Sequence, residues 1–226
     1  PLRIADILTF GEEAHGDAEI ISVTVEGGIH RTTYGETAPR VRKLANGLQS
    51  LGVKLGDRVA TLAWNGYRHF ELYYAISGIG AVCHTVNPRL SAEQMIYIIN
   101  HAGDSIICVD LTFVPILVAI RDKLPSNMKY IIMTDRGHMP DTVLENTLCY
   151  EEILETGESN IEWPEFSEET ASSLCYTSGT TGNPKGSLYT HRSTVLHSLT
   201  AGISFPETMR AGVRILPVVP LFHVNA

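Results

Sequence analysis

Short apolar runs alternate with amphipathic stretches along most of this chain, and this alternation constrains the fold more than any other feature of the sequence. Residues 58–64, 82–85, 106–110 and 130–134 have the pattern of buried strands. Helical patterns lie between them. Strands that alternate with helices in this way usually form a parallel sheet with helices packed on both faces. The sequence therefore predicts an α/β fold with mostly parallel sheets flanked by helices.

The helix signals are of two kinds. Val41, Leu44 and Leu48 recur at helical spacing, with Pro39 near the expected start of that helix and Gly52 just past its end. Ser91, three residues before Gln94, has the pattern of a capping box. Further helices are expected at residues 69–79, 113–124, 150–155 and 192–203.

The second half of the chain departs from this regular alternation. Residues 135–170 are rich in acidic residues, glycine and proline, which predicts a connection with one short helix. Strands are expected at residues 171–176 and 213–219. The sequence thus predicts a first α/β subdomain at residues 1–165, which includes the acidic connection, and the start of a second subdomain at residues 166–226.

Composition restricts the function. The net charge of −8 argues against a nucleic-acid-binding surface, and the longest apolar runs are too short to span a bilayer. The four cysteines are far apart and have no metal-ligand spacing, which favours free thiols in a reducing compartment. No signal peptide is visible. A cytoplasmic protein without a transmembrane segment is expected.

Residues 176–186 read YTSGTTGNPKG and have the composition of a phosphate-binding loop. Glycines allow backbone N–H groups to approach an anion closely, hydroxyls add donors, and Lys185 adds a positive charge. We expect a strand before this loop and a helix after it. The loop is not a Walker motif, because Pro184 and Gly186 stand where that motif needs glycine and Ser or Thr.

This loop resembles the phosphate-binding signature of the adenylate-forming (AMP-binding) superfamily. Residues 220–226, PLFHVNA, are similar to a downstream motif of that family, in which a histidine lies beside the acyl-adenylate. Residues 80–90, GAVCHTVNPRL, are similar to its fatty-acyl-CoA synthetase branch. One departure is Ser187, where a small aliphatic residue is more usual. The chain is therefore expected to be part of the large amino-terminal domain of an adenylate-forming enzyme.

The resemblance implies a two-step acid–thiol ligase reaction. A fatty or similarly apolar carboxylic acid attacks the α-phosphorus of ATP, which gives an acyl-adenylate and pyrophosphate. Coenzyme A then displaces AMP and forms a thioester. The resemblance implies ATP, Mg²⁺ and coenzyme A as cofactor or substrate, and positioning and charge neutralisation as the main sources of catalysis.

The resemblance also assigns site residues. His223 is the expected catalytic residue, although a histidine after an apolar run is often structural. Lys185 could bind phosphate, order the loop, or be an ordinary solvated lysine. No metal ligand can be named. The residues expected to bind the β- and γ-phosphates are Thr177, Ser178, Gly179, Thr180, Thr181, Gly182 and Lys185.

Members of this family are more than twice as long, so an inactive amino-terminal fragment without the carboxy-terminal domain is expected. It should form a homodimer or associate with the remainder of a longer chain. One alternative is a complete, non-catalytic nucleotide-binding module. Within the enzyme class, a luciferase or a peptide-synthetase adenylation domain stays open. A ligase for a short methylthio or branched acid is the second choice of substrate.

Overall fold

A computed structural model describes residues 1–177 and 183–223 of the chain. Its strands are β1 (Glu19–Val23), β2 (Ile29–Thr33), β3 (Arg58–Leu62), β4 (Val82–Thr85), β5 (Ile106–Val109), β6 (Lys129–Ile132), β7 (Thr147–Cys149), β8 (Ala171–Thr177) and β9 (Lys185–Thr190). Its α-helices are α1 (Ile4–His15), α2 (Tyr34–Ser50), α3 (Tyr67–Gly78), α4 (Ala92–Ala102), α5 (Val114–Ile120), α6 (Tyr150–Thr156) and α7 (His191–Ser204). Short 3₁₀ helices lie at Leu111–Phe113, Arg121–Lys123 and Arg136–His138.

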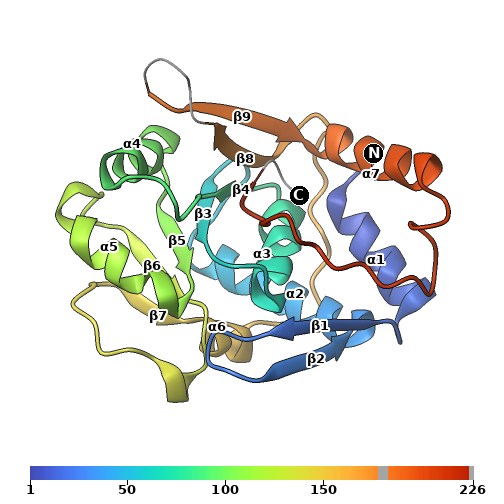
Figure 1. The fold of residues 1–226 in the computed structure, drawn as a ribbon, viewed down its shortest axis with the longest axis horizontal. Coiled ribbons are helices and arrows are strands. Elements are labelled where there is room, and N and C mark those ends of the chain that lie inside the picture. Colours follow the sequence, from blue (N-terminus) through green and yellow to red (C-terminus); the bar gives the residue numbers. More distant parts are fainter. Residues whose placement is uncertain (178–182, 224–226) are drawn as a thin grey trace.

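Within these residues, one seven-stranded sheet forms the centre of the molecule, in the order β7-β6-β5-β3-β4-β8-β9 (Figure 1). All neighbouring pairs are parallel except β8 and β9, which are antiparallel. A separate antiparallel hairpin of β1 and β2 lies below the sheet in this view. The prediction of an α/β fold with a mostly parallel sheet is confirmed.

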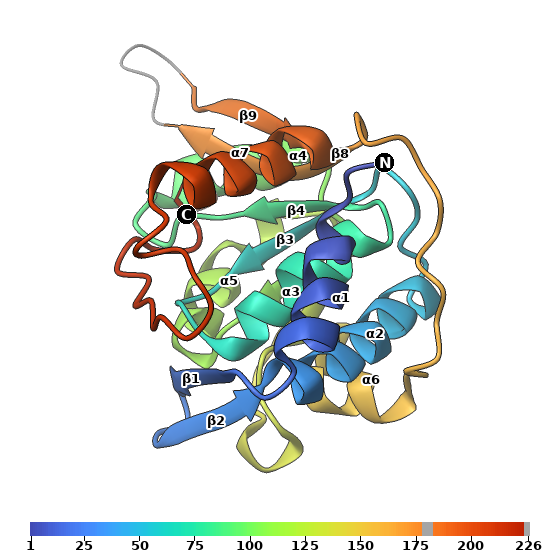
Figure 2. The ribbon, with the colours of Figure 1, turned by 90° about the vertical axis from the view of Figure 1, so that its right-hand side faces the viewer.

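Helices cover both faces of the sheet, because alternate residues of each strand point to opposite sides. Val59 and Cys108 belong to the core formed with α1, α2, α3 and α6. Ala60 and Val109, the neighbours of these residues in the chain, belong to the core formed with α4 and α5. In Figure 1 the strands separate α4 and α5 from α1, α2 and α3, and Figure 2 shows α1 and α3 on one face from the side.

Most predicted elements are present with small changes at their ends, and the capping box at Ser91 is confirmed. The helix expected around Val41 begins earlier, at Tyr34. Thr33 and Glu36 form a second capping box there, so Pro39 lies inside the helix rather than near its start. The four cysteines are all buried, and none of them forms a disulfide bond.

In the second half, one prediction is wrong and one strand was not predicted. Residues 213–219 do not form a strand; the carbonyl groups of Pro217 and Val219 accept hydrogen bonds from the Asn65 side chain rather than from a neighbouring strand. The phosphate-loop motif is not followed directly by a helix. It connects β8 to β9, and the helix begins only after β9.

The predicted division at residue 165 remains a prediction. β8 pairs with β4 and therefore extends the sheet formed by the first 165 residues. The acidic connection before β8 runs along the outside of α2 and α1 (Figure 2).

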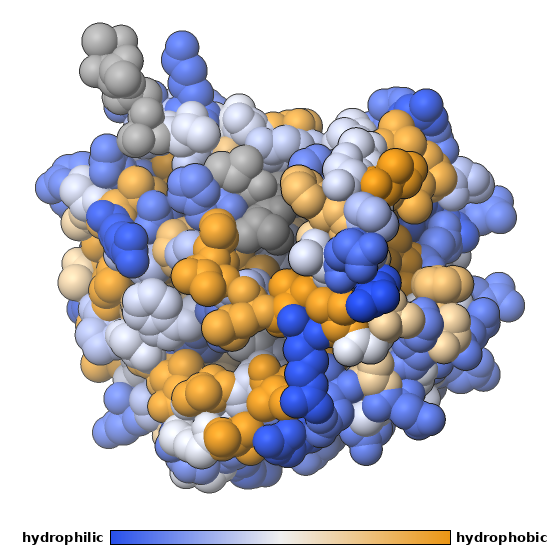
Figure 3. All heavy atoms as spheres, turned by 45° about the vertical axis from the view of Figure 1, so that its right-hand side comes forward, coloured by the Kyte–Doolittle hydropathy of each residue, from blue (hydrophilic) through white to orange (hydrophobic). Residues whose placement is uncertain are grey.

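Exposed hydrophobic side chains gather on one face of the molecule, where the segment after α7 crosses it (Figure 3). Ile203, Leu216 and Val218 are exposed by 80%, 82% and 81%. Residues 205–223, here called the C-terminal segment, contain further exposed apolar side chains, such as Phe205 and Ile215. An apolar surface of this kind commonly marks a contact with another protein surface.

A buried histidine gives the fold a defined pH dependence. His69 is fully buried; its Nδ1 lies 3.1 Å from the Trp64 carbonyl oxygen and its Nε2 lies 3.0 Å from the Thr61 hydroxyl. Burial lowers the pKa of His69 to about 4, against an ordinary value of 6.5. Between these values the unfolded chain takes up a proton that the folded chain does not, so folding stability falls as pH decreases.

We expect the substitution His69→Asn to remove this pH dependence. The free energy of unfolding of the wild type, relative to that of the variant, should fall by up to roughly 3 kcal/mol between pH 6.5 and pH 4. Denaturant titrations of both proteins across this range measure the difference. His191, whose pKa burial also lowers to about 4, is present in both proteins, so its contribution cancels. Parallel stability curves would contradict the assignment.

Candidate functional site

The carboxyl ends of β3, β4 and β8 lie at the same edge of the sheet, because these strands are parallel. Thr85 pairs with Cys175 at that edge, and Thr177 ends β8 two residues further on. The motif at residues 176–186 therefore leaves the sheet at the edge where ligands of parallel α/β proteins usually bind.

The helices that follow β3 and β4 pack on opposite faces of the sheet. After β3 it enters α3, which packs in the core of one face, and after β4 it enters α4, which packs in the core of the other. Neighbouring strands whose connections diverge in this way form the switch point of an open α/β sheet, where a crevice opens.

The C-terminal segment crosses this switch point and is held there by three side chains. Asn65, which follows β3, accepts a hydrogen bond from the Leu221 N–H at 2.7 Å. The hydroxyl of Tyr73 in α3 donates to the Leu221 carbonyl. The hydroxyl of Thr85, the last residue of β4, donates to the Phe222 carbonyl at 3.2 Å. Residues far apart in the sequence thus meet at the switch point, at the edge of the sheet from which the phosphate-binding motif leaves.

Asn65 is the residue that fixes the path of this segment. Its amide nitrogen donates to the carbonyls of Pro217 and Val219, at 2.9 and 3.0 Å, in addition to the bond that it accepts from Leu221. The side chain therefore takes the place of a neighbouring strand. The sequence prediction gave Asn65 no role in the site, although a polar residue directly after a buried strand is a recognisable signal in a parallel sheet.

His223 follows directly after these anchored residues. Its backbone N–H donates to the Pro220 carbonyl at 2.9 Å, which closes a turn, and its side chain is exposed. Because Phe222 is buried and bonded to Thr85, the imidazole is attached to a fixed point near the end of β4.

Two of the expected phosphate ligands stand at the base of the motif. Thr177 ends β8 and Lys185 begins β9, and the two residues are paired in the antiparallel register. The Thr177 hydroxyl donates to the Lys185 carbonyl at 3.5 Å, and both side chains are exposed. The remaining expected ligands lie outside the described residues: Ser178, Gly179, Thr180, Thr181 and Gly182.

One carboxyl group near this edge was also not predicted. Asp110 follows β5 and accepts a hydrogen bond from the Trp64 N–H at 2.7 Å, one residue before Asn65. Burial raises the pKa of Asp110 to about 6. The described part of the chain contains no group of three or more histidine, cysteine or acidic residues that could hold a metal ion.

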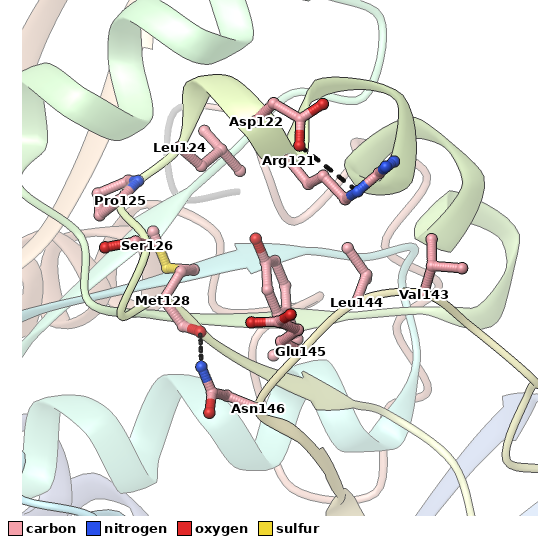
Figure 4. A pocket seen from close by; sticks show the side chains of 11 residues that line it. Arg121, Asp122, Leu124, Pro125, Ser126, Met128, Val143, Leu144, Glu145 and Asn146 are labelled. Carbon is pink, nitrogen blue, oxygen red and sulfur yellow. Dashed lines mark hydrogen bonds and ion pairs between the residues drawn. The ribbon is translucent and has the colours of Figure 1, made fainter.

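A hollow of about 250 Å³ lies at the opposite edge, near the amino ends of β6 and β7 (Figure 4). Arg121 and Asp122 form an ion pair on one side of it, and Asn146 donates to the Met128 carbonyl on the other. The hollow shares no residue with the switch point, so it does not belong to the candidate site. No helix in the described ranges is long and apolar enough to cross a membrane.

The chain was compared with known protein families. Residues 11–226 match the family described as AMP-binding enzyme. The chain belongs to this family. The match includes the strands of the central sheet, the motif at residues 176–186 and the C-terminal segment, so the AMP-binding family accounts for all the elements that meet at the switch point.

Several curated AMP-binding relatives are similar along the whole chain. A 3-methylmercaptopropionyl-CoA ligase of Ruegeria lacuscaerulensis is 48% identical and a medium-chain-fatty-acid–CoA ligase of Ectopseudomonas oleovorans is 47% identical, each over 100% of the chain. A long-chain-fatty-acid–CoA ligase of Thermus thermophilus is 42% identical. The chain spans 42%, 41% and 40% of the lengths of these three proteins.

Solved structures of AMP-binding proteins have the same fold. An anthranilate CoA ligase in complex with anthranoyl-AMP superposes with a TM-score of 0.77 at 23% identity, over 98% of this chain and 41% of that one. A fatty acyl CoA synthetase of Mycobacterium tuberculosis superposes with a TM-score of 0.68 at 23% identity, over 98% and 40%. At this identity the likeness concerns the fold alone.

We expect Asn65→Ala to release the C-terminal segment. The variant loses one hydrogen bond accepted from Leu221 and two donated to Pro217 and Val219, so the free energy of unfolding should fall by about 1–3 kcal/mol. Hydrogen exchange at the Leu221 amide should become at least about tenfold faster, since its acceptor is gone.

Asn46→Ala provides the matched control. It removes an asparagine whose amide oxygen accepts a hydrogen bond from the Glu158 N–H at 3.1 Å, away from the switch point. Exchange at Leu221 should stay unchanged in this variant. Equal protection of Leu221 in Asn65→Ala and the wild type would show that Asn65 does not hold the segment.

Proposed function

We propose that this chain is the ATP-binding part of an acid–thiol ligase that converts an apolar carboxylic acid into its coenzyme A thioester. The observation that carries the proposal is the meeting of two motifs at one switch point. Thr177 and Lys185 form the base of the Gly/Thr motif, and the segment that leads to His223 is bonded to Asn65, Tyr73 and Thr85.

The first step would bring two anions together. A carboxylate oxygen attacks the α-phosphorus of ATP, the bond to pyrophosphate breaks, and an acyl-adenylate forms. The chain's own contribution is to bind and neutralise the phosphates. The Lys185 ammonium and the Thr177 hydroxyl are exposed at the start of the motif, and we propose that they bind the β- and γ-phosphates with Ser178, Gly179, Thr180, Thr181 and Gly182.

His223 is proposed to act at the α-phosphate and the carboxylate. An imidazole N–H there could donate to an oxygen that gains charge as the carboxylate attacks. The fixed carbonyl of Phe222 and the turn from Pro220 would limit how far the imidazole moves. In the second step the coenzyme A thiolate attacks the acyl carbonyl and AMP leaves.

The acid is proposed to be a medium- or long-chain fatty acid. Two of the relatives compared above are named for fatty acids of these lengths. A short methylthio acid is the second candidate, because another relative of similar identity is named a 3-methylmercaptopropionyl-CoA ligase. Mg²⁺ bound with the phosphates and a cytoplasmic location remain parts of the proposal that rest on the family resemblance.

The predicted ligase activity is tested with the full-length protein and a panel of carboxylic acids. We expect AMP release that depends on ATP, coenzyme A and an apolar acid, with the highest kcat/KM on a fatty acid. Strongest activity on amino acids would contradict the coenzyme A ligase assignment. ATP binding without AMP release on any acid would favour a non-catalytic nucleotide-binding module. Residues 1–226 alone should catalyse no pyrophosphate exchange.

A matched pair of lysine variants serves as the control for this assay. Lys185→Ala should raise the KM for ATP about tenfold or more, because a hydrogen bond from a charged donor to phosphate is lost. Lys123→Ala removes an exposed lysine outside the motif, in the short helix after α5, and should leave kcat and the KM for ATP unchanged. An unchanged KM in Lys185→Ala would remove that residue from the proposed site.

We also propose that further residues of a longer chain cover the apolar face around Ile203, Leu216 and Val218. The relatives are more than twice as long as this chain, which supports such a partner. Residues 1–226 alone should then self-associate in sedimentation experiments, while the full-length protein should not use this face. Leu216→Asp should reduce the self-association. A strictly monomeric fragment at high concentration would contradict the proposal.

A further inference from the structure

The side chain of Tyr176, the first residue of the Gly/Thr motif, does not point into the site. It lies on the sheet face covered by α4, where it packs against the apolar cores of that face. The Tyr176 hydroxyl lies 2.7 Å from Nδ1 of His101, in the last turn of α4. A hydrogen bond between these two side chains thus links the first residue of the motif, in β8, to the helix α4.

The Tyr176 ring also contacts the other end of the motif. Tyr176 pairs with Gly186 in the antiparallel register of β8 and β9. A Cβ atom built at Gly186 would lie 3.4 Å from Cζ of Tyr176 and 3.0 Å from a methyl carbon of Leu174. Because Gly186 has no side chain, it leaves room for the Tyr176 ring, which packs against both strands at the base of the motif, β8 and β9.

The ring is supported from below by a buried polar pair. The ring of His84, in β4, lies 5.2 Å from the ring of Tyr176, and Nδ1 of His84 lies 2.6 Å from Oδ2 of Asp104. Both His84 and Asp104 are almost completely buried. Burial and, after it, the charge of Asp104 raise the pKa of Tyr176 to about 12. The phenol is therefore protonated at neutral pH and can donate a hydrogen bond to Nδ1 of His101.

Tyr97 is a further aromatic neighbour of His101. Its ring stacks on His101, with the ring centroids 5.2 Å apart and 25° between the planes. Tyr97 and His101 are one turn apart in α4, so the helix itself orients the imidazole. The imidazole that accepts the hydrogen bond from Tyr176 is thus held by the stacked ring of Tyr97 on one side and by the helix backbone.

We propose that the hydrogen bond between Tyr176 and His101 is a positioning element that holds the phosphate-binding motif in register for ATP. This inference rests on the proposed function. Neither residue is proposed to touch the nucleotide; the bond acts by fixing the strands at the base of the motif, where Thr177 of β8 pairs with Lys185 of β9. The bond is therefore expected to affect ATP binding and to leave binding of the carboxylic acid and coenzyme A unchanged.

The experiment uses the full-length protein and separates the KM for each substrate. Tyr176→Phe removes only the hydroxyl, and His101→Ala removes its acceptor. Loss of one hydrogen bond corresponds to about a fivefold rise in the KM for ATP. Both variants should show this rise, and the double variant should be no worse than either one. The KM for the acid should change less than twofold.

Two controls distinguish positioning from a general loss of structure. His101→Gln offers a carbonyl oxygen to the Tyr176 hydroxyl and should restore the KM for ATP. Tyr97→Phe removes another hydroxyl from the same cluster, one without a hydrogen bond among the described residues, and should have no effect. Equal rises in the KM for ATP and for the acid, or additive effects in the double variant, would overturn the proposal.

A second measurement does not depend on activity. Trypsin cleavage after Lys185, at the base of the motif, should be faster in Tyr176→Phe and His101→Ala than in the wild type and in Tyr97→Phe. If the wild type activates no acid while cleavage still follows this order, the proposed ligase function is wrong but the positioning role of the bond is supported. If the wild type is active while cleavage and the KM for ATP are unchanged in both variants, only the positioning role is wrong.

Discussion

The parallel pairing of β8 with β4 is the interaction on which the candidate site depends. These strands are separated by 85 residues of chain that include three further strands of the same sheet, yet Cys83, His84 and Thr85 pair directly with Ser173, Leu174 and Cys175. The pairing aligns the end of β8 with the end of β4. Without it, the Gly/Thr motif would have no fixed relation to the switch point where the C-terminal segment is bonded.

A second constraint comes from the way in which backbone groups are satisfied at the switch point. Residues 213–219 are apolar and resemble a strand, but no neighbouring strand is available to them within the described residues. Asn65 supplies two donors and one acceptor instead, and Tyr73 and Thr85 supply further donors. The Phe222 carbonyl is buried, and a buried carbonyl without a partner costs free energy, so its bond to Thr85 anchors the end of the segment, while Asn65 directs the exposed residues before it.

This difference explains how far the sequence could predict the molecule. The parallel sheet was predictable because β3, β5 and β6 are short and apolar and alternate with helices. The loop at residues 176–186 was found from composition alone, but β9 was not, because KGSLYT is a polar edge strand without a clear pattern. The path of residues 213–219 depends on a single distant asparagine. Long-range hydrogen bonds of this kind leave no periodic signal in a sequence.

The buried polar groups beneath Tyr176 are best explained by the same geometry. A histidine and an aspartate in a dry sheet are costly, and Nε2 of His84 and Oδ1 of Asp104 have no partner among the described residues. Replacing a buried ion pair by an apolar pair of similar volume is often neutral or stabilising, so stability alone is a poor explanation for this pair. The Asp104 charge favours the protonated phenol of Tyr176, and the His84 ring limits where that phenol can lie. The buried pair of His84 and Asp104 would thus lower the stability of the sheet but fix the direction of the chain as it enters the motif.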